Sequence, residues 1–259
     1  MKVGIIVESR MASTRLPGKI LLPIVGKPAL ELMVERLKQV KEAHEVIIAT
    51  TENERDLTIV DFASRWGVGC FRGSEEDVLS RVVGAARKYN LDIIVEITSD
   101  CPLADPDIIS EYIRTFMASD VDYVANIIKR THPRGMDVQV FKTSILNDIE
   151  ATTKDAADRE HPSLHIYEHP EKYKLMNMFA EPGYHMPDQR LTLDTPQDYF
   201  VIRTVYEELY PKNRNFRYKD IYSLLTKRPD IRKINSHIDQ KRPRGYDHTE
   251  RARKYLGLD

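Results

Sequence analysis

Three basic side chains, Arg10, Arg15 and Lys19, lie in one short segment directly after the first apolar run of the chain. The segment, residues 8–19, has the sequence ESRMASTRLPGK. Arginine donates paired hydrogen bonds to phosphate oxygens, lysine supplies a compact charge, and the amides of a loop add further donors. The segment therefore predicts either a loop that binds a polyphosphate or a solvated basic loop.

Two common phosphate-binding patterns are absent from this segment. The P-loop pattern requires Ser or Thr after Gly-Lys, but Gly18-Lys19 is followed by Ile20, and no G-x-G-x-x-G is present. The position of the segment nevertheless favours ligand binding. In an open parallel sheet, ligands lie beyond the carboxyl ends of the strands, which is where a loop after the first strand begins.

Short apolar runs that alternate with segments of helical spacing predict the elements that position this loop. Strands are expected at 2–7, 44–51, 68–73, 91–98 and 121–126, and helices at 28–41, 53–67, 74–90 and 105–119. Beyond residue 126 we expect strands at 136–141, 173–181 and 190–194, two helical pieces within 143–170, and a helix at 196–210. Such alternation indicates βαβ crossovers. The expected fold is α/β: a Rossmann-like, mostly parallel sheet with flanking helices and a small C-terminal extension.

Bulk composition excludes several classes of protein. The 259 residues carry a formal net charge of −1, so no global field attracts nucleic acid or an anionic membrane. Cys70 and Cys101 lack the spacing of metal ligands or a disulfide framework, and we expect reduced thiols. No apolar stretch approaches the about 18 residues of a membrane span. We expect a cytoplasmic protein.

Two acidic residues follow predicted strands. Asp100 lies just past the strand at 91–98, and Asp194 ends the strand at 190–194. Both would lie at one edge of the sheet if these strands are parallel. Mg²⁺ accepts one or two carboxylates together with phosphates and waters. Alternatively, Asp100 forms a turn before Pro102 and Asp194 caps the helix that begins near Pro196.

The order of residues in RMASTRLPGK resembles the signature R-M-G-S-T-R-L-P-G-K of sugar-activating cytidylyltransferases, in the branch of spore-coat polysaccharide biosynthesis protein F. This branch is related to the synthetases of CMP-ketodeoxyoctonate and CMP-sialic acid. Further blocks similar to the family follow in order at 72–81, 97–109, 137–141, 159–161 and 191–198. The resemblance covers roughly the first 200 residues. It implies a nucleotide-diphospho-sugar transferase (GT-A-like) fold, Mg²⁺, and transfer of CMP from CTP to a sugar or sugar-like acid with release of pyrophosphate.

The resemblance also assigns roles to residues. It implies a catalytic set of Arg10, Lys19 and Asp100, and a metal-binding pair of Asp100 and Asp194. The implied nucleotide-binding residues are Glu8, Ser9, Arg10, Met11, Ala12, Ser13, Arg15, Lys19, Ser74, Asp77 and Asp100. The implied substrate-binding residues are Arg134, Asp137, Arg159, Glu160 and His161. For the side chains of Ser74 and Asp77, helix capping is the competing interpretation. Helix-spaced His161, His165 and His169 are interpreted as solvated rather than metal-binding.

Two residues depart from the family signature. Ala12 replaces a usual glycine, and alanine tolerates positive φ poorly, so the loop path there is expected to differ slightly. Glu8 stands where glutamine is common. We expect it to add negative charge near the triphosphate, which would alter nucleotide choice or pair with a loop arginine.

The domain prediction is a nucleotidyltransferase domain at 1–210, with its substrate and dimerisation part at about 127–190, and a basic extension at 211–259. The basic run at 227–259 suggests a solvated surface or an extended arm on a neighbouring subunit. By resemblance we expect a homodimer. Four alternative functions stay open: a guanylyl- or uridylyltransferase acting on a sugar phosphate, a phosphonate cytidylyltransferase, a glycosyltransferase, and a non-catalytic nucleotide-binding protein. The glycosyltransferase fits less well, because residues 99–105 match a D-x-D motif poorly.

Overall fold

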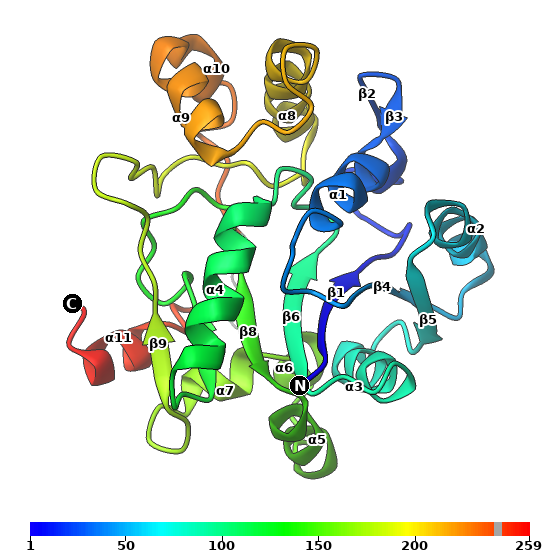
Figure 1. Ribbon diagram of the computed structural model, residues 1–259, viewed down its shortest axis with the longest axis vertical. Helices are drawn as coiled ribbons and strands as arrows, with labels where there is room; N and C mark the ends of the chain where they lie inside the picture. The colour runs from blue at the N-terminus through cyan, green and yellow to red at the C-terminus, as the bar shows by residue number, and fades with distance from the viewer. Residues whose placement is uncertain (241–244) are drawn as a thin grey trace.

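A computed structural model describes residues 1–240 and 245–259 of the chain. A seven-stranded sheet with the order β5-β4-β1-β6-β8-β7-β9 forms its centre (Figure 1). The strands are β1 (Val3–Glu8), β4 (Glu45–Thr51), β5 (Gly69–Gly73), β6 (Ile93–Thr98), β7 (Tyr123–Ala125), β8 (Gln139–Lys142) and β9 (Leu175–Asn177). The pairings are parallel except that β8 runs antiparallel to both β6 and β7. The expected mostly parallel α/β sheet is therefore confirmed.

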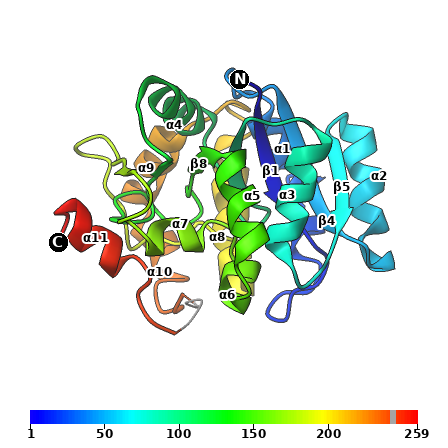
Figure 2. The same cartoon turned by 90° about the horizontal axis from the view of Figure 1, so that it is seen from below.

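Helices cover both faces of the sheet, because the central strands are apolar on both sides. Val3, Ile5 and Val7 of β1 belong to one hydrophobic cluster, and Ile6 belongs to the other. The first cluster includes residues of α1 (Ala29–Leu37), α2 (Leu57–Trp66) and α4 (Pro106–Ala118). The second includes residues of α3 (Val78–Lys88), α5 (Thr143–Thr152), α7 (Leu164–Glu168) and α11 (Glu250–Leu256). Figure 2 shows α3, α5, α6 (Ala156–Glu160) and α7 together on one side.

Residues beyond 210 fold onto the rest of the protein. A third hydrophobic cluster joins α8 (Pro196–Leu209), α9 (Tyr218–Lys227) and α10 (Pro229–Lys233), which gather at the top of Figure 1. Further along, α11 contacts α7 and buries Ala252. The expectation of an extended arm is therefore wrong for the described part of 227–259, because apolar residues such as Ile231 and Ala252 anchor it. Residues 241–244 of that basic run lie outside the described residues.

Two other expectations differ from the structure. Residues 143–170 form three helices rather than two pieces. Residues 190–194 form no strand, only an isolated bridge between Arg134 and Arg190. The reason is that this segment divides its backbone hydrogen bonds: the Leu191 amide donates to Arg134 (2.7 Å), whereas the Leu193 amide donates to Asp100 (2.7 Å). A continuous ladder with one partner is thus prevented.

The topology creates one functional edge. The strand order reverses at β1, with β4 and β5 on one side and β6 on the other, and such a switch point opens a crevice at the carboxyl ends. Because β8 is antiparallel, residues 126–138 run from the carboxyl end of β7 to the start of β8 along this same edge. Smaller elements complete the edge: the ribbon of β2 (Pro23–Ile24) and β3 (Lys27–Pro28), and the 3₁₀ helices η1 (Lys19–Leu21) and η2 (Glu54–Asp56).

None of the helices in 1–240 or 245–259 has the length and apolar character that crossing a membrane requires.

Candidate active site

The loop after β1 is held by backbone bonds and by one buried carboxylate. The amide of Ser9 donates to Ala49 (3.1 Å), and the amide of Gly18 donates to Met11 (3.2 Å). Between them, the Met11 amide donates to Asp56 Oδ1 (2.8 Å), and Thr51 donates its hydroxyl hydrogen to Oδ2 of the same carboxylate. Asp56 has no exposed surface. Asp56 therefore fixes the middle of the loop. This role was not predicted, because acidic residues are common at the start of a helix.

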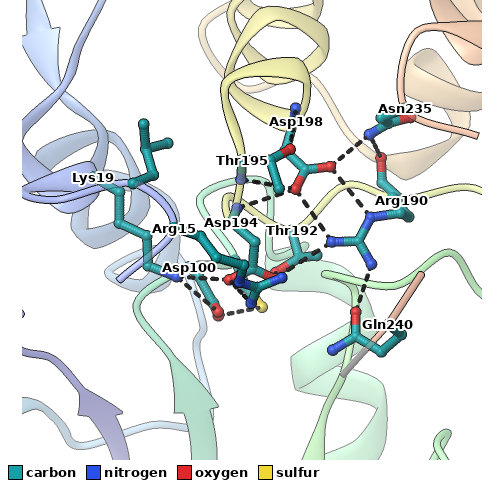
Figure 3. A network of polar contacts seen from close by, with 12 residues as sticks. Arg15, Lys19, Asp100, Arg190, Thr192, Asp194, Thr195, Asp198, Asn235 and Gln240 are labelled. Atoms are coloured by element: carbon teal, nitrogen blue, oxygen red, sulfur yellow. Dashed lines mark hydrogen bonds and ion pairs between the residues drawn. The ribbon is translucent and has the colours of Figure 1, made fainter. Parts of the chain in front are cut away.

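Lys19 brings two carboxylates together at the carboxyl end of β6. Its Nζ lies 3.2 Å from Asp100 Oδ2 and 2.9 Å from Asp194 Oδ1 (Figure 3). Arg15 adds a second cation, with Nη2 2.9 Å from the same Asp194 oxygen. Two loop cations and the two predicted acids thus converge in one place.

The charges of this cluster stabilise one another. Burial by itself would lower the pKa of Lys19, but the charges of Asp100 and Asp194 and their hydrogen bonds outweigh it and raise that pKa above its ordinary value. Burial likewise opposes ionisation of Asp100, yet the Lys19 charge and hydrogen bonds from Thr98 and Lys19 hold its pKa below the usual range. Lys19 is therefore charged and Asp100 ionised at neutral pH.

The second carboxylate oxygen of Asp194, Oδ2, belongs to a separate buried network of polar side chains. Arg190 Nη2 lies 3.4 Å from Asp194 Oδ2 and 3.2 Å from Asp198 Oδ2. Asp198 accepts from the amides of Asp194 (3.2 Å) and Thr195 (3.1 Å), as part of the capping box of α8. Two further side chains complete the network. Asn235 Nδ2 donates to Asp198 Oδ1 (2.8 Å), and Arg190 Nη1 donates to Gln240 Oε1 (2.5 Å). The sequence patterns did not point to Arg190, Asn235 or Gln240.

A cleft of about 570 Å³ opens over these groups. The predicted residues that line it are Glu8, Ser9, Arg10, Ala12, Ser13, Arg15, Lys19, Asp100, Glu160, His161 and Asp194. The side chain of Met11 instead packs against the core. Ser74 and Asp77 also lie outside the lining and act as caps: Ser74 Oγ accepts from the Asp77 amide (3.0 Å), and Asp77 accepts from the Ser80 amide (2.9 Å). Their contact with a nucleotide stays a prediction.

One wall of the cleft is formed by the turn between β5 and α3. Glu75 is held by Arg55 Nη2, at 2.5 and 2.7 Å from its two oxygens, and Arg81 donates to the Ser74 carbonyl. Arg10 lies only within 3.7 Å of Glu75 and leaves 48% of its side chain exposed. Arg10 is thus a cation at the mouth of the cleft, less restrained than Lys19.

The surroundings of Glu8 oppose the negative charge that its type suggests. Burial raises its pKa well above the usual range, and the neighbouring Glu96 of β6 raises it further, by its charge and by a hydrogen bond. The Arg81 charge acts in the opposite direction but is the weaker influence. The pKa of Glu96 is also raised, chiefly by burial. A neutral Glu8 carboxyl resembles the amide of the glutamine that it replaces.

The predicted substrate-binding residues do not gather in one place. Glu160 and His161 line the cleft, whereas Arg134 and Asp137 line a second cavity of about 620 Å³. Arg159 lines neither: its Nη1 lies 3.0 Å from Asp77, and its Nη2 donates to the Glu150 carbonyl (3.0 Å). Arg159 therefore connects the start of α3 to α5.

The helix-spaced histidines do not form a metal site. His165 contacts Asp158 (2.9 Å) and His169 contacts Glu171 (3.1 Å). Across the described residues, no three His, Cys, Asp or Glu side chains are grouped so that they could hold a metal ion. Any cation at Asp100 and Asp194 would need phosphate or water ligands as well.

A family model described as cytidylyltransferase matches residues 4–227. The chain belongs to this cytidylyltransferase family. The match begins in β1 and extends through α9, beyond the roughly 200 residues that the sequence motifs cover. The cytidylyltransferase is therefore a nucleotidyltransferase enzyme, and the resemblance inferred from RMASTRLPGK is confirmed.

Relatives support this assignment over most of the chain. Spore coat polysaccharide biosynthesis protein SpsF of Bacillus subtilis is 31% identical over 232 residues, which cover 87% of this chain and 94% of that protein. A solved cytidylyltransferase from Leptospira borgpetersenii serovar Hardjo-bovis aligns with a TM-score of 0.86 and 35% identity, over 93% of this chain and all of that one. The structure of CMP:2-keto-3-deoxy-manno-octonic acid synthetase complexed with CTP shares the fold, with a TM-score of 0.59 and 19% identity over 80% and 99%.

Proposed function

We propose that this cytidylyltransferase transfers CMP from CTP to an oxygen of a sugar or sugar-like acid, in the biosynthesis of surface polysaccharides or glycoconjugates. The observation that carries the proposal is the convergence of Lys19 and Arg15 on Asp100 and Asp194 at the switch point of the sheet. Cations and acids at one edge can hold a triphosphate and position an attacking oxygen. SpsF, whose name refers to spore-coat polysaccharide, supports the biosynthetic context.

The proposed reaction forms no covalent bond between the protein and its substrates. The acceptor oxygen forms a bond to the α-phosphorus, the bond between the α-phosphorus and its bridging oxygen breaks, and pyrophosphate leaves. Lys19, Arg15 and Arg10 bind the triphosphate and stabilise the charge that builds on the departing pyrophosphate. The amides of Ser9, Met11 and Gly18 already donate within the protein and hold the loop in shape, so any amide donors to the phosphates must come from other residues of the loop. The rate of transfer is thus raised by the positioning of the substrates and by neutralisation of the phosphate charge.

A divalent cation fits beside these residues. Asp100 and Asp194 already direct one oxygen each at a single cation, the Lys19 ammonium, which shows that they can share a positive charge. Two carboxylates completed by phosphate and water oxygens match the ligands of Mg²⁺. When bound, Mg²⁺ would neutralise phosphate charge and polarise the phosphoryl oxygens. Lys19 would then be free to donate to the phosphates.

The base is expected at the turn between β5 and α3. Cytosine presents an amino group that a carbonyl or carboxylate can accept, and Arg81 and Arg55 fix the carbonyl of Ser74 and the carboxylate of Glu75 there. This rigid acceptor set favours CTP over UTP, whose base has no amino group. The homodimer and the cytoplasmic location stay predictions from the sequence.

A thermal-shift series tests the proposal. CTP, UTP, GTP and ATP are compared with and without Mg²⁺, on the wild type and on Lys19→Ala. A ligand at 100 times its Kd stabilises the folded state by about 2.7 kcal/mol. We expect a Mg²⁺-dependent shift with CTP alone, much reduced in Lys19→Ala. A shift with UTP or GTP instead would assign another donor, and no shift with any nucleotide would contradict the proposed site.

A further inference from the structure

The second cavity, of about 620 Å³, lies between two segments that are distant in the sequence. One is the connection from β7 to β8, which contributes Lys129, Arg130 and Arg134. The other is the chain end after residue 244, which contributes Tyr246, His248 and Arg253. A buried Ala252 fastens α11 against α7, so the chain end is a packed wall rather than a loose strand.

This cavity adjoins the reaction centre through Asp194. Oδ1 of Asp194 faces Lys19 and Arg15, whereas Oδ2 faces Arg190. Arg190 in turn binds Gln240, which lines the second cavity (Figure 3). The backbone gives a second link, because Arg134 donates to Gln189 (3.0 Å) and accepts from Leu191 (2.7 Å), just before Asp194. The side chains of Asp194, Arg190 and Gln240 therefore connect the cleft to the second cavity.

The side chains around the second cavity favour an anion. Its cationic residues are Lys129, Arg130, Arg134 and Arg253, and its acidic residues are Asp137, Asp247 and Asp259. Arg130 holds Asp137, and Arg253 lies 2.9 Å from Asp247 and 3.6 Å from Asp259. All three acids are thus paired within the wall. Four cationic side chains against three acidic ones leave a small excess of positive charge around the cavity.

Two polar groups are prepared for a ligand. Gln139 Oε1 accepts from Tyr123 (2.5 Å) and Ser163 (2.8 Å), which fixes the amide and leaves its Nε2 donors unused within the described residues. His248 is 7% exposed; its Nδ1 lies 3.2 Å from Glu168, while its Nε2 is buried and has no hydrogen-bond partner. A carboxylate only accepts, so Nδ1 carries a hydrogen, and in the neutral ring Nε2 offers a lone pair. A buried unpaired group of this kind is costly unless a ligand satisfies it.

We propose that the second cavity binds the acceptor, an anionic polyhydroxy compound, and that residues 245–259 form one wall of its site. Arg134 and Lys129 attract the anionic group, the Gln139 amide donates to a ligand oxygen, and His248 Nε2 accepts from a hydroxyl. The proposal rests on the proposed function, since only a nucleotidyl transfer needs an acceptor beside Asp194. The anionic group is a carboxylate, as in a sugar acid, or a phosphate, as in a sugar phosphate.

The test measures CTP-dependent pyrophosphate release with three probes: a keto-sugar acid, a hexose 1-phosphate and a neutral hexose. We expect turnover with one anionic probe, and its identity distinguishes carboxylate from phosphate. In Arg134→Gln we expect the KM for that probe to rise at least about tenfold, and in His248→Asn about three- to tenfold, with the KM for CTP unchanged. Lys254→Gln, an exposed change on the same α11, is the matched control and should behave as the wild type.

The outcomes separate this inference from the proposed function. If CTP fails to shift the melting temperature of the wild type, the proposed function fails. If CTP binds but neither anionic probe is used, or the neutral hexose is preferred, the anionic acceptor site is overturned. If an anionic probe is used and both variants keep the wild-type KM for it, the second cavity is not its site. A folding defect in His248→Asn would show as a lower melting temperature, and Arg134→Gln then decides alone.

Discussion

The two cavities that Asp194, Arg190 and Gln240 connect are built in different ways. Much of the cleft comes from one contiguous segment, residues 8–19, completed by the end of β6, the start of α3, residues 160–161 and Asp194. The second cavity is assembled from the β7–β8 connection, Tyr167 of α7 and the chain end. The cleft is fixed by backbone hydrogen bonds and the buried Asp56, whereas the second cavity depends on the packing of α11. Under the proposed assignment, the contiguous segment would hold the constant ligand CTP, and the composite wall would allow the acceptor to differ.

The largest effect confined to the cleft is expected from removing the ammonium group of Lys19. In Lys19→Ala we expect turnover to fall at least about 10²–10³-fold, because a group that stabilises the pyrophosphate charge is lost. Pyrophosphate release with CTP and a working acceptor measures this. The exposed Lys212→Ala is the control. Mg²⁺ should raise the melting temperature of Lys19→Ala more than that of the wild type, since Asp100 and Asp194 lose their shared ammonium. Turnover within tenfold of the wild type would contradict the role of Lys19.

Removing Arg190 should damage both cavities at once. Arg190→Met leaves the buried Asp198 without its cation, and breaking a buried pair costs about 3–5 kcal/mol of unfolding free energy. Urea unfolding measures the loss. The double variant Arg190→Met/Asp198→Asn removes the stranded charge and should recover part of it. If Arg190→Met unfolds as the wild type does, Asp194 does not depend on the network that joins the two cavities.

The smallest effect concerns Glu8, where the cleft departs from the family signature. A carboxyl whose pKa is raised on folding contributes stability below the ordinary pKa of glutamate, and this contribution is lost as the pH rises through the raised value. As the pH rises above the ordinary pKa of glutamate, the melting temperature of the wild type should therefore fall relative to that of Glu8→Gln, by a few degrees. Parallel melting curves would show instead that Glu8 does not titrate in this range.

The same contrast explains what the sequence could predict. The strands at 2–7 and 91–98 and the position of Asp100 follow from local patterns, because parallel strands place their carboxyl ends at one edge. Asp194 was expected at that edge as the end of a strand, but residues 190–194 form only an isolated bridge there. Asp56, Arg190 and Asn235 were missed because their roles depend on buried pairings with residues far away in the chain. The helices after 210 were missed because apolar anchors such as Phe216 and Ile231 are spaced among many charges. Arg134 and Asp137 were predicted, but the segment that faces them was not.

The reversed direction of β8 has a consequence for how such enzymes diversify. Both ends of the stretch 126–138 are fastened by the β7–β8 ladder, where Ala125 pairs with Gln139. Extra residues inserted there would bulge over the catalytic edge without disturbing the register of the sheet, and doubling the length of a flexible loop costs only about 0.6 kcal/mol. Evolution can therefore lengthen or shorten this stretch to admit a new sugar while the machinery that handles CTP is inherited unchanged.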